Sequence, residues 1–238
     1  MSIIFNNIDK MSFDDLDEGS EFIPLMTSED EEALEKESLP EVLPILPLTN
    51  NVLFPGVVIP INAGRDKSIK LINDANKSNK LIGVVAQKNS TIENPTVDNI
   101  YGIGTVAKIL RVLKMPDGNT TVIIQGKKRF KIKSIVKTDP YIQATIDPVS
   151  DRSQKKSDGK FSATIDAIKD IALKIIKENP NIPSEASFAI KNIHSSTFLI
   201  NFVCSNMNIT IKDKQDMLSS ISVEKRALKC LKFLNVEY

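Results

Sequence analysis

The prevailing spacing of apolar residues changes close to position 150 in this chain of 238 residues. In residues 129–137, RFKIKSIVK, apolar and basic side chains alternate with a period near two, as in a β-strand with one buried face. From Phe161 onward, apolar residues recur every three or four positions, as on one face of an α-helix. This change of period predicts an α+β protein in which a β-rich domain precedes a helical domain.

The β-rich domain is expected to cover residues 39–149. Because Pro44 and Pro47 interrupt its first apolar run, we expect that run to be an edge strand or the entrance of a strand. The turn at Pro55 and Gly56 leads into a strand that should end near Pro60. Runs of β-branched residues with one amphipathic helix among them predict a closed or nearly closed β-barrel. The helix is expected at 64–80, and further strands at 81–88, 102–116, 120–126, 129–137 and 139–149.

The helical domain is expected at residues 161–238, after a polar linker at 150–160. Several helices with short connections predict a bundle, and the last run lacks a glycine or proline stop, as in a helix cut in mid-course. The stripe of the first helix consists of Phe161, Ile165, Ile168, Ala172 and Ile175. Candidate N-caps of the later helices are Ser184, Ser195 or Ser196, Thr210 or Asp213, and Ser222.

Charge is distributed very unevenly. Residues 1–41 hold thirteen Asp and Glu against two Lys, whereas the rest of the chain holds 29 basic and 17 acidic residues. We interpret residues 1–38 as an acidic, disordered tail, because like charges repel and few apolar groups are available to bury. The tail either acts as a solubilising leader or lies on the basic body, where it would compete with acidic ligands.

The chain has no apolar run long enough to span a membrane and no secretory signal at its start. We therefore expect a cytoplasmic protein with no membrane partner. Cys204 and Cys230 are expected to be reduced packing thiols in such a compartment.

The stretch DGNTTVIIQGKKRF, residues 117–130, resembles a phosphate-binding loop at first sight. Such a loop needs a glycine where Thr121 stands and a hydroxyl where Lys128 stands, and it must open a helix. A tight turn at 115–119 followed by strand alternation instead predicts a β-hairpin, so no nucleotide site is expected.

Other chemical signatures are equally weak. Residues 102–107, GIGTVA, fit a dinucleotide fingerprint, but a β-type run follows where a helix is required. One histidine, His194, and two distant cysteines do not supply a usual zinc site. We therefore expect no catalytic residues, no metal and no cofactor in this chain.

Nucleic-acid binding is a further possibility that composition argues against. Basic residues cluster at Lys127, Lys128, Arg129, Lys131 and Lys133, yet the chain has no Trp and only 5% aromatic residues. Solvated strand faces are the simpler interpretation. Weak, salt-sensitive binding of DNA or another polyanion stays open.

Residues 40–236 resemble the N-terminal domain of the ATP-dependent Lon proteases. The segments that carry the resemblance are LPILPLTNNVLFPGVVIPI, GRDKSIKLI, LIGVVAQK, YGIGTVAKILRVLKMPDGNTTVIIQGKKRFKI, NPNIPSEASFAIKNI and FLINFVCSNMNITIKDKQDML. The resemblance implies a PUA-like β-barrel at 39–149 and a helical bundle that leads towards an ATPase module. The acidic residues 1–38 lie outside it.

The resemblance also implies a function. In this family the region recognises unfolded or damaged proteins and helps to organise a homo-hexamer. ATP and magnesium belong to an ATPase module with Walker motifs, and catalysis to a protease module with a Ser-Lys dyad. This chain carries neither, so it is expected to be the non-catalytic substrate-recognition region of an ATP-dependent serine protease. The alternative is a stand-alone adaptor or ligand-binding protein with the same domain.

Apolar residues in predicted loops are the candidates for contact with substrate, because a surface for unfolded chains should offer exposed apolar area. Leu53, Phe54 and Pro55 lie between two predicted strands, and Met115 and Pro116 lie beside the hairpin turn. We expect these side chains to be partly exposed. The alternative for Phe54 is that its ring plugs the end of the barrel.

Overall fold

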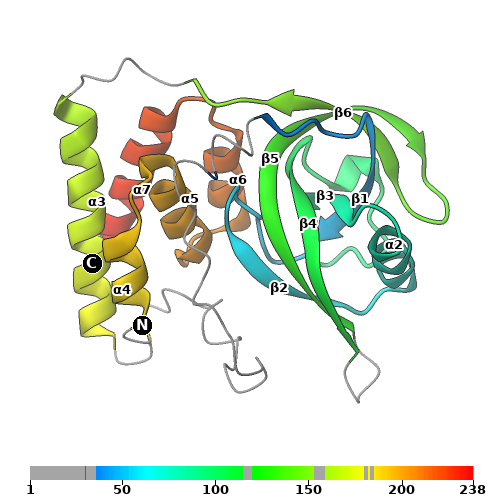
Figure 1. Ribbon diagram of the computed structural model, residues 1–238, viewed down its shortest axis with the longest axis horizontal. Helices are drawn as coiled ribbons and strands as arrows, with labels where there is room; N and C mark the ends of the chain where they lie inside the picture. The colour runs from blue at the N-terminus through cyan, green and yellow to red at the C-terminus, as the bar shows by residue number, and fades with distance from the viewer. Residues whose placement is uncertain are drawn as a thin grey trace.

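A computed structural model describes residue 30 and residues 36–114, 120–152, 159–179, 182 and 185–237. The α+β prediction is confirmed: a β-sheet lies beside a layer of helices (Figure 1). The strands are β1 (Val42–Leu48), β2 (Val58–Ala63), β3 (Leu81–Ala86), β4 (Ile103–Lys114), β5 (Thr120–Lys137) and β6 (Gln143–Val149). The helices are α2 (Asp66–Asn76), α3 (Gly159–Glu178), α4 (Glu185–Asn192), α5 (Ser196–Asn206), α6 (Ile211–Ser219) and α7 (Val223–Glu237), with a 3-10 turn, η2 (Val97–Asn99).

Strand β5 organises the sheet. The strand order is β2-β5-β4-β3-β1-β6, and β5 also pairs with β6, so the pairings return to β5. The two runs at 120–126 and 129–137 form this one long strand, which pairs first with β2 and β4 and later with β6. Register shifts at four places let β5 and its neighbours bend enough for this exchange of partners.

Proline residues lie inside two strands, β1 and β2. Two expectations were therefore wrong: that the first apolar run is an edge strand or a strand entrance, and that the next strand ends near Pro60. Strand β1 is not at an edge: it lies between β3, which is parallel, and β6, which is antiparallel. Its residues 42–44 have register partners in β6 and its residues 45–48 in β3, so Pro44 and Pro47 are each paired on one side only. Strand β2 continues past Pro60 to Ala63, which is tolerated because β2 pairs with β5 alone.

The helical layer follows the apolar stripe. Ile165, Ile168, Ala172 and Ile175 of α3 are buried, as predicted, and Phe161 is partly buried against the same core. Helix α5 is buried continuously from Phe198 to Asn206. The cap predictions are confirmed at three helices, where the hydroxyls of Ser195, Thr210 and Ser222 accept hydrogen bonds from backbone N–H groups. Ser184 lies outside the described residues.

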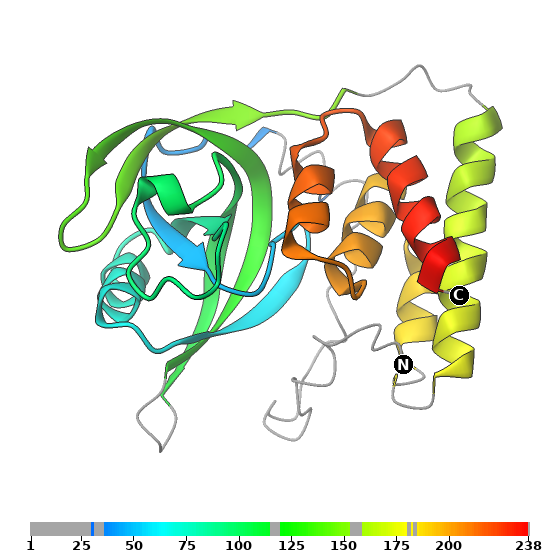
Figure 2. The same ribbon diagram turned by 180° about the vertical axis from the view of Figure 1, so that it is seen from behind.

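One buried apolar core joins the sheet and the helices. It includes Phe54 and Ile124 from the β-rich part together with Phe198 and Leu234 from the helical part. A second, smaller cluster around Phe130 lies within the β-rich part alone. Seen from behind, α5 and α6 lie against the sheet, whereas α2 covers its opposite end (Figure 2). The expected linker falls between β6 and α3, but the core is continuous across that division, and α3 begins at Gly159 rather than at 161.

Gly126 lets the loop after β1 lie against β5. Its backbone exchanges two hydrogen bonds with the loop, from Gly56 N and to Val57 O, each 2.9 Å long. A Cβ at Gly126 would lie 2.2 Å from the carbonyl oxygen of Phe54, which is backbone and cannot move aside alone. The strand needs glycine here for space rather than for a phosphate.

We expect Gly126→Ala to lower the free energy of unfolding by about 1–3 kcal/mol, because the added methyl overpacks a backbone contact. Urea unfolding followed by far-UV circular dichroism measures the change. Gly102→Ala is the matched control, since a Cβ there meets nothing within 4 Å. Equal midpoints for the two variants would contradict the argument.

Candidate functional site

The apolar loop predicted to face solvent is buried instead. The side chain of Leu53 is 2% exposed and that of Phe54 is 0% exposed, so the expectation that they are partly exposed is wrong. Pro55 is half-buried. The alternative, in which the Phe54 ring plugs the end of a barrel, is right in that the ring is buried, and the ring lies in the core that the sheet shares with the helices. The reason is that Gly56, at a φ of 81°, turns the chain back onto β5 and drives the apolar side chains between the sheet and the helices.

Hydrogen bonds attach this loop to both layers. The hydroxyl of Thr105, on β4, donates to the carbonyl of Leu53 over 2.6 Å, and the amide of Asn201, on α5, donates to the carbonyl of Pro55 over 3.2 Å. A third contact runs from Gln215 on α6 to the carbonyl of Ile103 on β4. Residues 53–55 therefore form a joint between the two parts of the molecule.

Met115 and Pro116 lie outside the described residues, but the strands that lead to them are informative. Pro60 on β2, Ile123 on β5 and Arg111 on β4 stand opposite one another, so their side chains share one face of the sheet. Apolar residues on this side are half-buried, and Leu110 is 43% exposed at a register shift. We call this surface the outer face; its apolar residues are Val58, Pro60, Leu110, Leu113 and Ile123.

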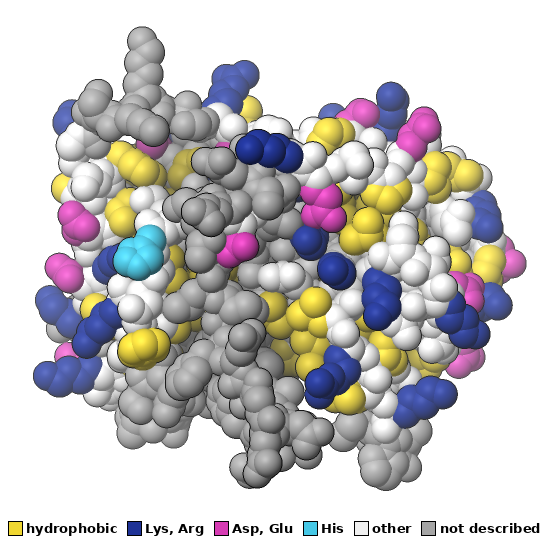
Figure 3. All heavy atoms as spheres, in the orientation of Figure 1, with side chains coloured by type: hydrophobic (Ala, Val, Ile, Leu, Met, Phe, Trp, Pro, Cys, Tyr) yellow, Lys and Arg dark blue, Asp and Glu magenta, His cyan; other side chains and the backbone are white. Residues whose placement is uncertain are grey.

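Figure 3 shows hydrophobic side chains gathered over β2 with basic side chains beside them. Strands β4 and β5 together carry nine Lys and Arg and no Asp or Glu. Two of them, Lys108 opposite Gln125 and Arg111 opposite Ile123, are exposed on the outer face, which thus combines apolar area with positive charge. Such a surface suits a polypeptide segment whose apolar residues are exposed by unfolding.

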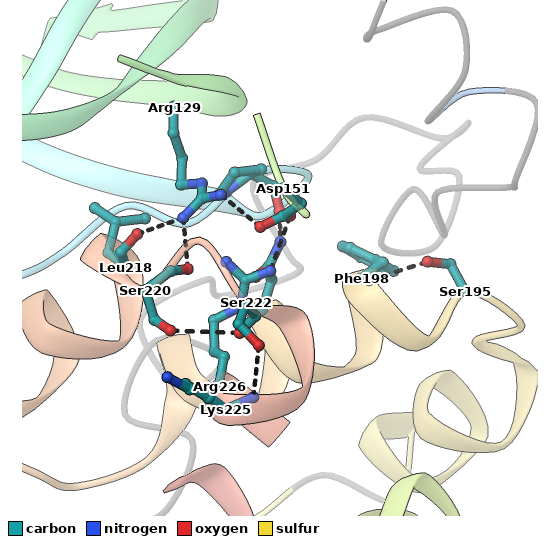
Figure 4. A network of polar contacts seen from close by, with 11 residues as sticks. Arg129, Asp151, Ser195, Phe198, Leu218, Ser220, Ser222, Lys225 and Arg226 are labelled. Carbon is teal, nitrogen blue, oxygen red and sulfur yellow. Dashed lines mark hydrogen bonds and ion pairs between the residues drawn. The ribbon is translucent and has the colours of Figure 1, made fainter. Parts of the chain in front are cut away.

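One of the clustered basic residues is not on the surface at all. Arg129 is 2% exposed, so the interpretation of the whole cluster as a solvated strand face is wrong for this residue. Its guanidinium donates to the carbonyls of Leu218 and Ser220, over 2.7 and 2.9 Å, and forms an ion pair with Asp151 (Figure 4). The other oxygen of Asp151 binds Arg226 of α7 over 2.9 Å.

This network joins β5, the end of the β-rich part and the α6–α7 turn around one carboxylate. Burial lowers the pKa of Arg129 to about 10, against the opposing effect of Asp151, so this guanidinium stays charged at neutral pH. Arg226 is 0% exposed, and its Nε and Nη1 have no hydrogen-bond partner within the described part of the chain. Two buried cations therefore depend on one anion. No sequence spacing signals this arrangement, because residues 129, 151 and 226 meet only in the folded chain.

The two cysteines and the single histidine were the remaining candidates for a chemical role. Cys204 and Cys230 are buried free thiols, and a hydrogen bond with Cys204, together with burial, raises the pKa of Cys230 well above its usual value. Cys230 is therefore a protonated packing residue at neutral pH. His194 is exposed between α4 and α5. In the described ranges, no group of three or more His, Cys, Asp and Glu is placed to hold a metal ion.

One glycine of each glycine motif, Gly104 or Gly126, lies within a strand. Gly104 belongs to β4, where a Cβ would lie 2.2 Å from the carbonyl oxygen of Val84, so this glycine permits close packing of backbones. Gly126 lies within β5, which pairs antiparallel with β4, and this pairing confirms the hairpin prediction. Residues 115–119 of its turn are not described. None of the helices in the described residues is long and apolar enough to cross a membrane.

Comparison with known proteins agrees with this architecture. The family model of the ATP-dependent protease La (LON) substrate-binding domain matches residues 42–236. A Lon protease of Flavobacterium johnsoniae is 60% identical over 230 residues, which are 97% of this chain and 28% of that protein. A Lon protease of Cytophaga hutchinsonii is 47% identical over 90% of this chain and 26% of its own length. The chain thus spans about a quarter of the length of these relatives.

Solved structures share the fold. The N-terminal domain of Mycobacterium avium complex Lon protease superposes with a TM-score of 0.65 at 18% identity, covering 82% of this chain and 98% of that one. A Lon N-terminal domain protein from Xanthomonas campestris gives a TM-score of 0.54 at 15% identity, covering 80% and 97%. With the family match across residues 42–236, these comparisons show that the chain belongs to the Lon substrate-binding domain family.

Proposed function

We propose that this chain is the substrate-engaging N-terminal region of an ATP-dependent Lon-type serine protease that degrades misfolded and regulatory proteins in the cytoplasm. The observation that carries the proposal is the match of residues 42–236 to the Lon substrate-binding domain, together with 60% identity to a Lon protease of which this chain covers 28%. A stand-alone adaptor is not favoured, because the relatives from Flavobacterium johnsoniae and Cytophaga hutchinsonii are Lon proteases of which this chain covers only 28% and 26%.

The proposal extends to the fold of the β-rich part. The return of the strand pairings to β5 supports a PUA-like barrel formed by β1, β3, β4, β5 and β6, with β2 added outside it. The shared core and the network around Asp151 would then hold this barrel firmly on the helical layer.

In the whole protein we expect further modules to supply the chemistry. ATP and magnesium would be bound by an ATPase module, peptide bonds would be cleaved by a Ser-Lys dyad in a protease module, and six copies would assemble. This chain would deliver unfolded or damaged proteins to that machinery. The hydrogen bonds at residues 53–55 suit the role, because they connect the sheet to the helices, so that a client bound to the sheet would be held in a defined position relative to both.

Within this chain, we propose that the outer face touches clients, with Met115 and Pro116 next to it in sequence and Pro55 as a weaker candidate. Leu53 and Phe54 are buried and support the fold instead. The proposal therefore shifts the contact surface from the loop after β1 to the strands β2, β5 and β4.

The test uses the full-length protein encoded by the native gene, whose size is first checked with an antibody raised against this chain. A band several-fold larger than 26.4 kDa is expected, and a band at 26.4 kDa would overturn the proposal of a protease. Degradation of unfolded casein is then measured with ATP. We expect Leu110→Ser with Ile123→Ser to raise the KM for casein about tenfold, the equivalent of roughly 1.4 kcal/mol, with unchanged cleavage of a short fluorogenic peptide.

The matched control is Leu228→Ser, which removes a side chain that is 58% exposed on α7, away from the outer face. It should leave the KM for casein within a factor of about two, since isolated exposed apolar residues carry little binding energy. An equal rise in KM for both variants would show that the outer face has no special role.

A further inference from the structure

Lys127 and Lys128 lie side by side at an irregularity of the sheet. Thr105 stands opposite Arg129 and Ala107 opposite Gly126, so two residues of β5 face the single residue Val106 of β4. Such a bulge breaks the normal alternation of side chains and re-aims them. Both ammonium groups can therefore reach the same neighbour, although they are adjacent in sequence.

That neighbour is Glu37. Lys127 Nζ lies 3.1 Å from a carboxylate oxygen of Glu37, and Lys128 Nζ donates to the backbone carbonyl of Glu37 over 2.7 Å. The side chain of Lys127 is only 15% exposed and that of Glu37 is 39% exposed. The two lysines thus recognise one acidic residue of a polypeptide through its carboxylate and its main-chain oxygen together.

The residue bound in this way belongs to the acidic segment at the start of the chain. Residues 1–41 carry thirteen of the 30 Asp and Glu, whereas β4 and β5 carry nine Lys and Arg and no acidic residue. The family match begins only at residue 42, so Glu37 is not part of the shared domain. The acidic segment is therefore attached to the domain at the point where a basic pair holds one of its carboxylates.

We propose that Lys127 and Lys128 form a binding site for acidic polypeptide segments, and that the chain's own acidic residues before β1 occupy it as a tethered competitor. The proposal rests on the proposed function, in that the external ligand is an acidic stretch of a client protein. A client with apolar and acidic residues would cover the outer face and displace Glu37 from the lysines. Clients without acidic residues would gain no binding affinity from Lys127 and Lys128.

Charge and tethering explain why Glu37 occupies the two lysines and why a client can displace it. A single ion pair that is partly exposed contributes little, so Glu37 can be displaced. Because Glu37 belongs to the same chain, its effective concentration at the lysines would nevertheless be about millimolar, which disfavours weak external ligands. The segment would thus set a threshold that only clients with several acidic residues exceed.

A polypeptide is favoured over a nucleic acid as the ligand. Lys128 binds a main-chain carbonyl oxygen, which an amino-acid residue offers and a phosphodiester does not. The chain has no Trp and 5% aromatic residues, so the stacking platforms that hold single-stranded nucleic acids are scarce. The occupant seen at the site is itself a glutamate of a polypeptide.

The test measures binding of a fluorescein-labelled oligoglutamate peptide to the whole 238-residue chain by fluorescence anisotropy at several salt concentrations. Neutralising acidic residues that precede β1 in the sequence should free the site, and we expect binding about tenfold tighter than for the unchanged chain, with the gain lost at high salt. This head-neutral variant replaces with amides the residues Glu29, Asp30, Glu31, Glu32, Glu35 and Glu37.

Two controls separate the site from net charge. A body-neutral variant changes the net charge equally but leaves the segment intact, and its affinity should stay within a factor of about two of the unchanged chain. It replaces with amides the exposed residues Asp66, Glu93, Asp98, Asp166, Asp170 and Asp216. Adding Lys127→Met and Lys128→Met to the head-neutral variant keeps the apolar stems of the lysines and should abolish the gain.

Each other outcome overturns the proposal. No gain in the head-neutral variant would show that the segment does not compete, and an equal gain in the body-neutral variant would reduce the effect to net charge. A gain that survives removal of both lysines would place the site elsewhere. Tighter binding of a labelled oligothymidylate than of oligoglutamate, with the same dependence on the lysines, would make the ligand a nucleic acid. Casein degradation tests the outer face separately, so failure here leaves that proposal standing.

Discussion

Replacing Phe54 with alanine is expected to lower the free energy of unfolding by about 3–5 kcal/mol, the range for removing a buried phenylalanine ring. Phe54 is 0% exposed and belongs to the core that joins the sheet to the helices. Its backbone is held against Gly126 by the turn at Gly56, so the loop cannot easily collapse into the vacated space. The cavity left by the Phe54 ring should therefore stay largely unfilled, and the loss of stability should be close to its full value.

Chemical unfolding followed by circular dichroism measures this loss. Phe188→Ala is the matched control: Phe188 is 57% exposed on α4, and its removal should change stability by less than about 0.5 kcal/mol. If Phe54→Ala left stability unchanged but weakened the binding of an unfolded peptide, Phe54 would be a contact residue for substrate and its assignment to the core would fail.

The second large effect is expected at Asp151. Changing it to asparagine removes the only carboxylate that the described residues place against Arg129 and Arg226, and should cost about 3–5 kcal/mol, as when one partner of a buried ion pair is removed. Arg129 would keep its bonds to the carbonyls of Leu218 and Ser220, whereas the amide would offer the two guanidinium groups one neutral acceptor oxygen in place of a carboxylate. The attachment of α7 to the sheet should loosen first.

Two comparisons sharpen this result. Asp147→Asn breaks an exposed pair with Lys133, with both side chains more than half exposed, and should cost less than about 1 kcal/mol. Arg226→Met should cost less than Asp151→Asn, because it also removes a buried cation whose Nε and Nη1 have no partner in the described structure. A larger loss for Arg226→Met would show that the second guanidinium, rather than the shared carboxylate, stabilises the junction.

Local patterns predicted the elements well. The stripe of apolar residues found α3, and hydroxyl residues before apolar runs marked the starts of α5, α6 and α7. β-Branched residues between turn signals identified β4, and period-two alternation identified the second half of β5 and β6. These features depend on contacts between residues near in sequence or on which face is buried. Each is therefore visible in the order of the residues.

Features that depend on distant neighbours were predicted less well. Pro44 and Pro47 suggested an edge strand, but β1 divides its pairing between β3 and β6. Leu53 and Phe54 suggested a surface loop, but both are buried in the core that the sheet shares with the helices. Lys127, Lys128 and Arg129 looked like one cluster, yet two bind Glu37 and the third is buried against α6 and α7. In each case the sequence did not show which distant part of the chain pairs with, or packs against, these residues.

The sequence by itself determined the α+β class, the helices and strands, the hairpin in place of a phosphate loop, and the resemblance to Lon N-terminal domains. Tertiary structure alone decided which apolar residues are core and which are surface, and which basic residues face water. The physical reason is that alternation shows only that a strand has two faces. Whether a face is buried depends on distant residues, such as Asn201, Asp151 and Arg226, that the fold brings to it.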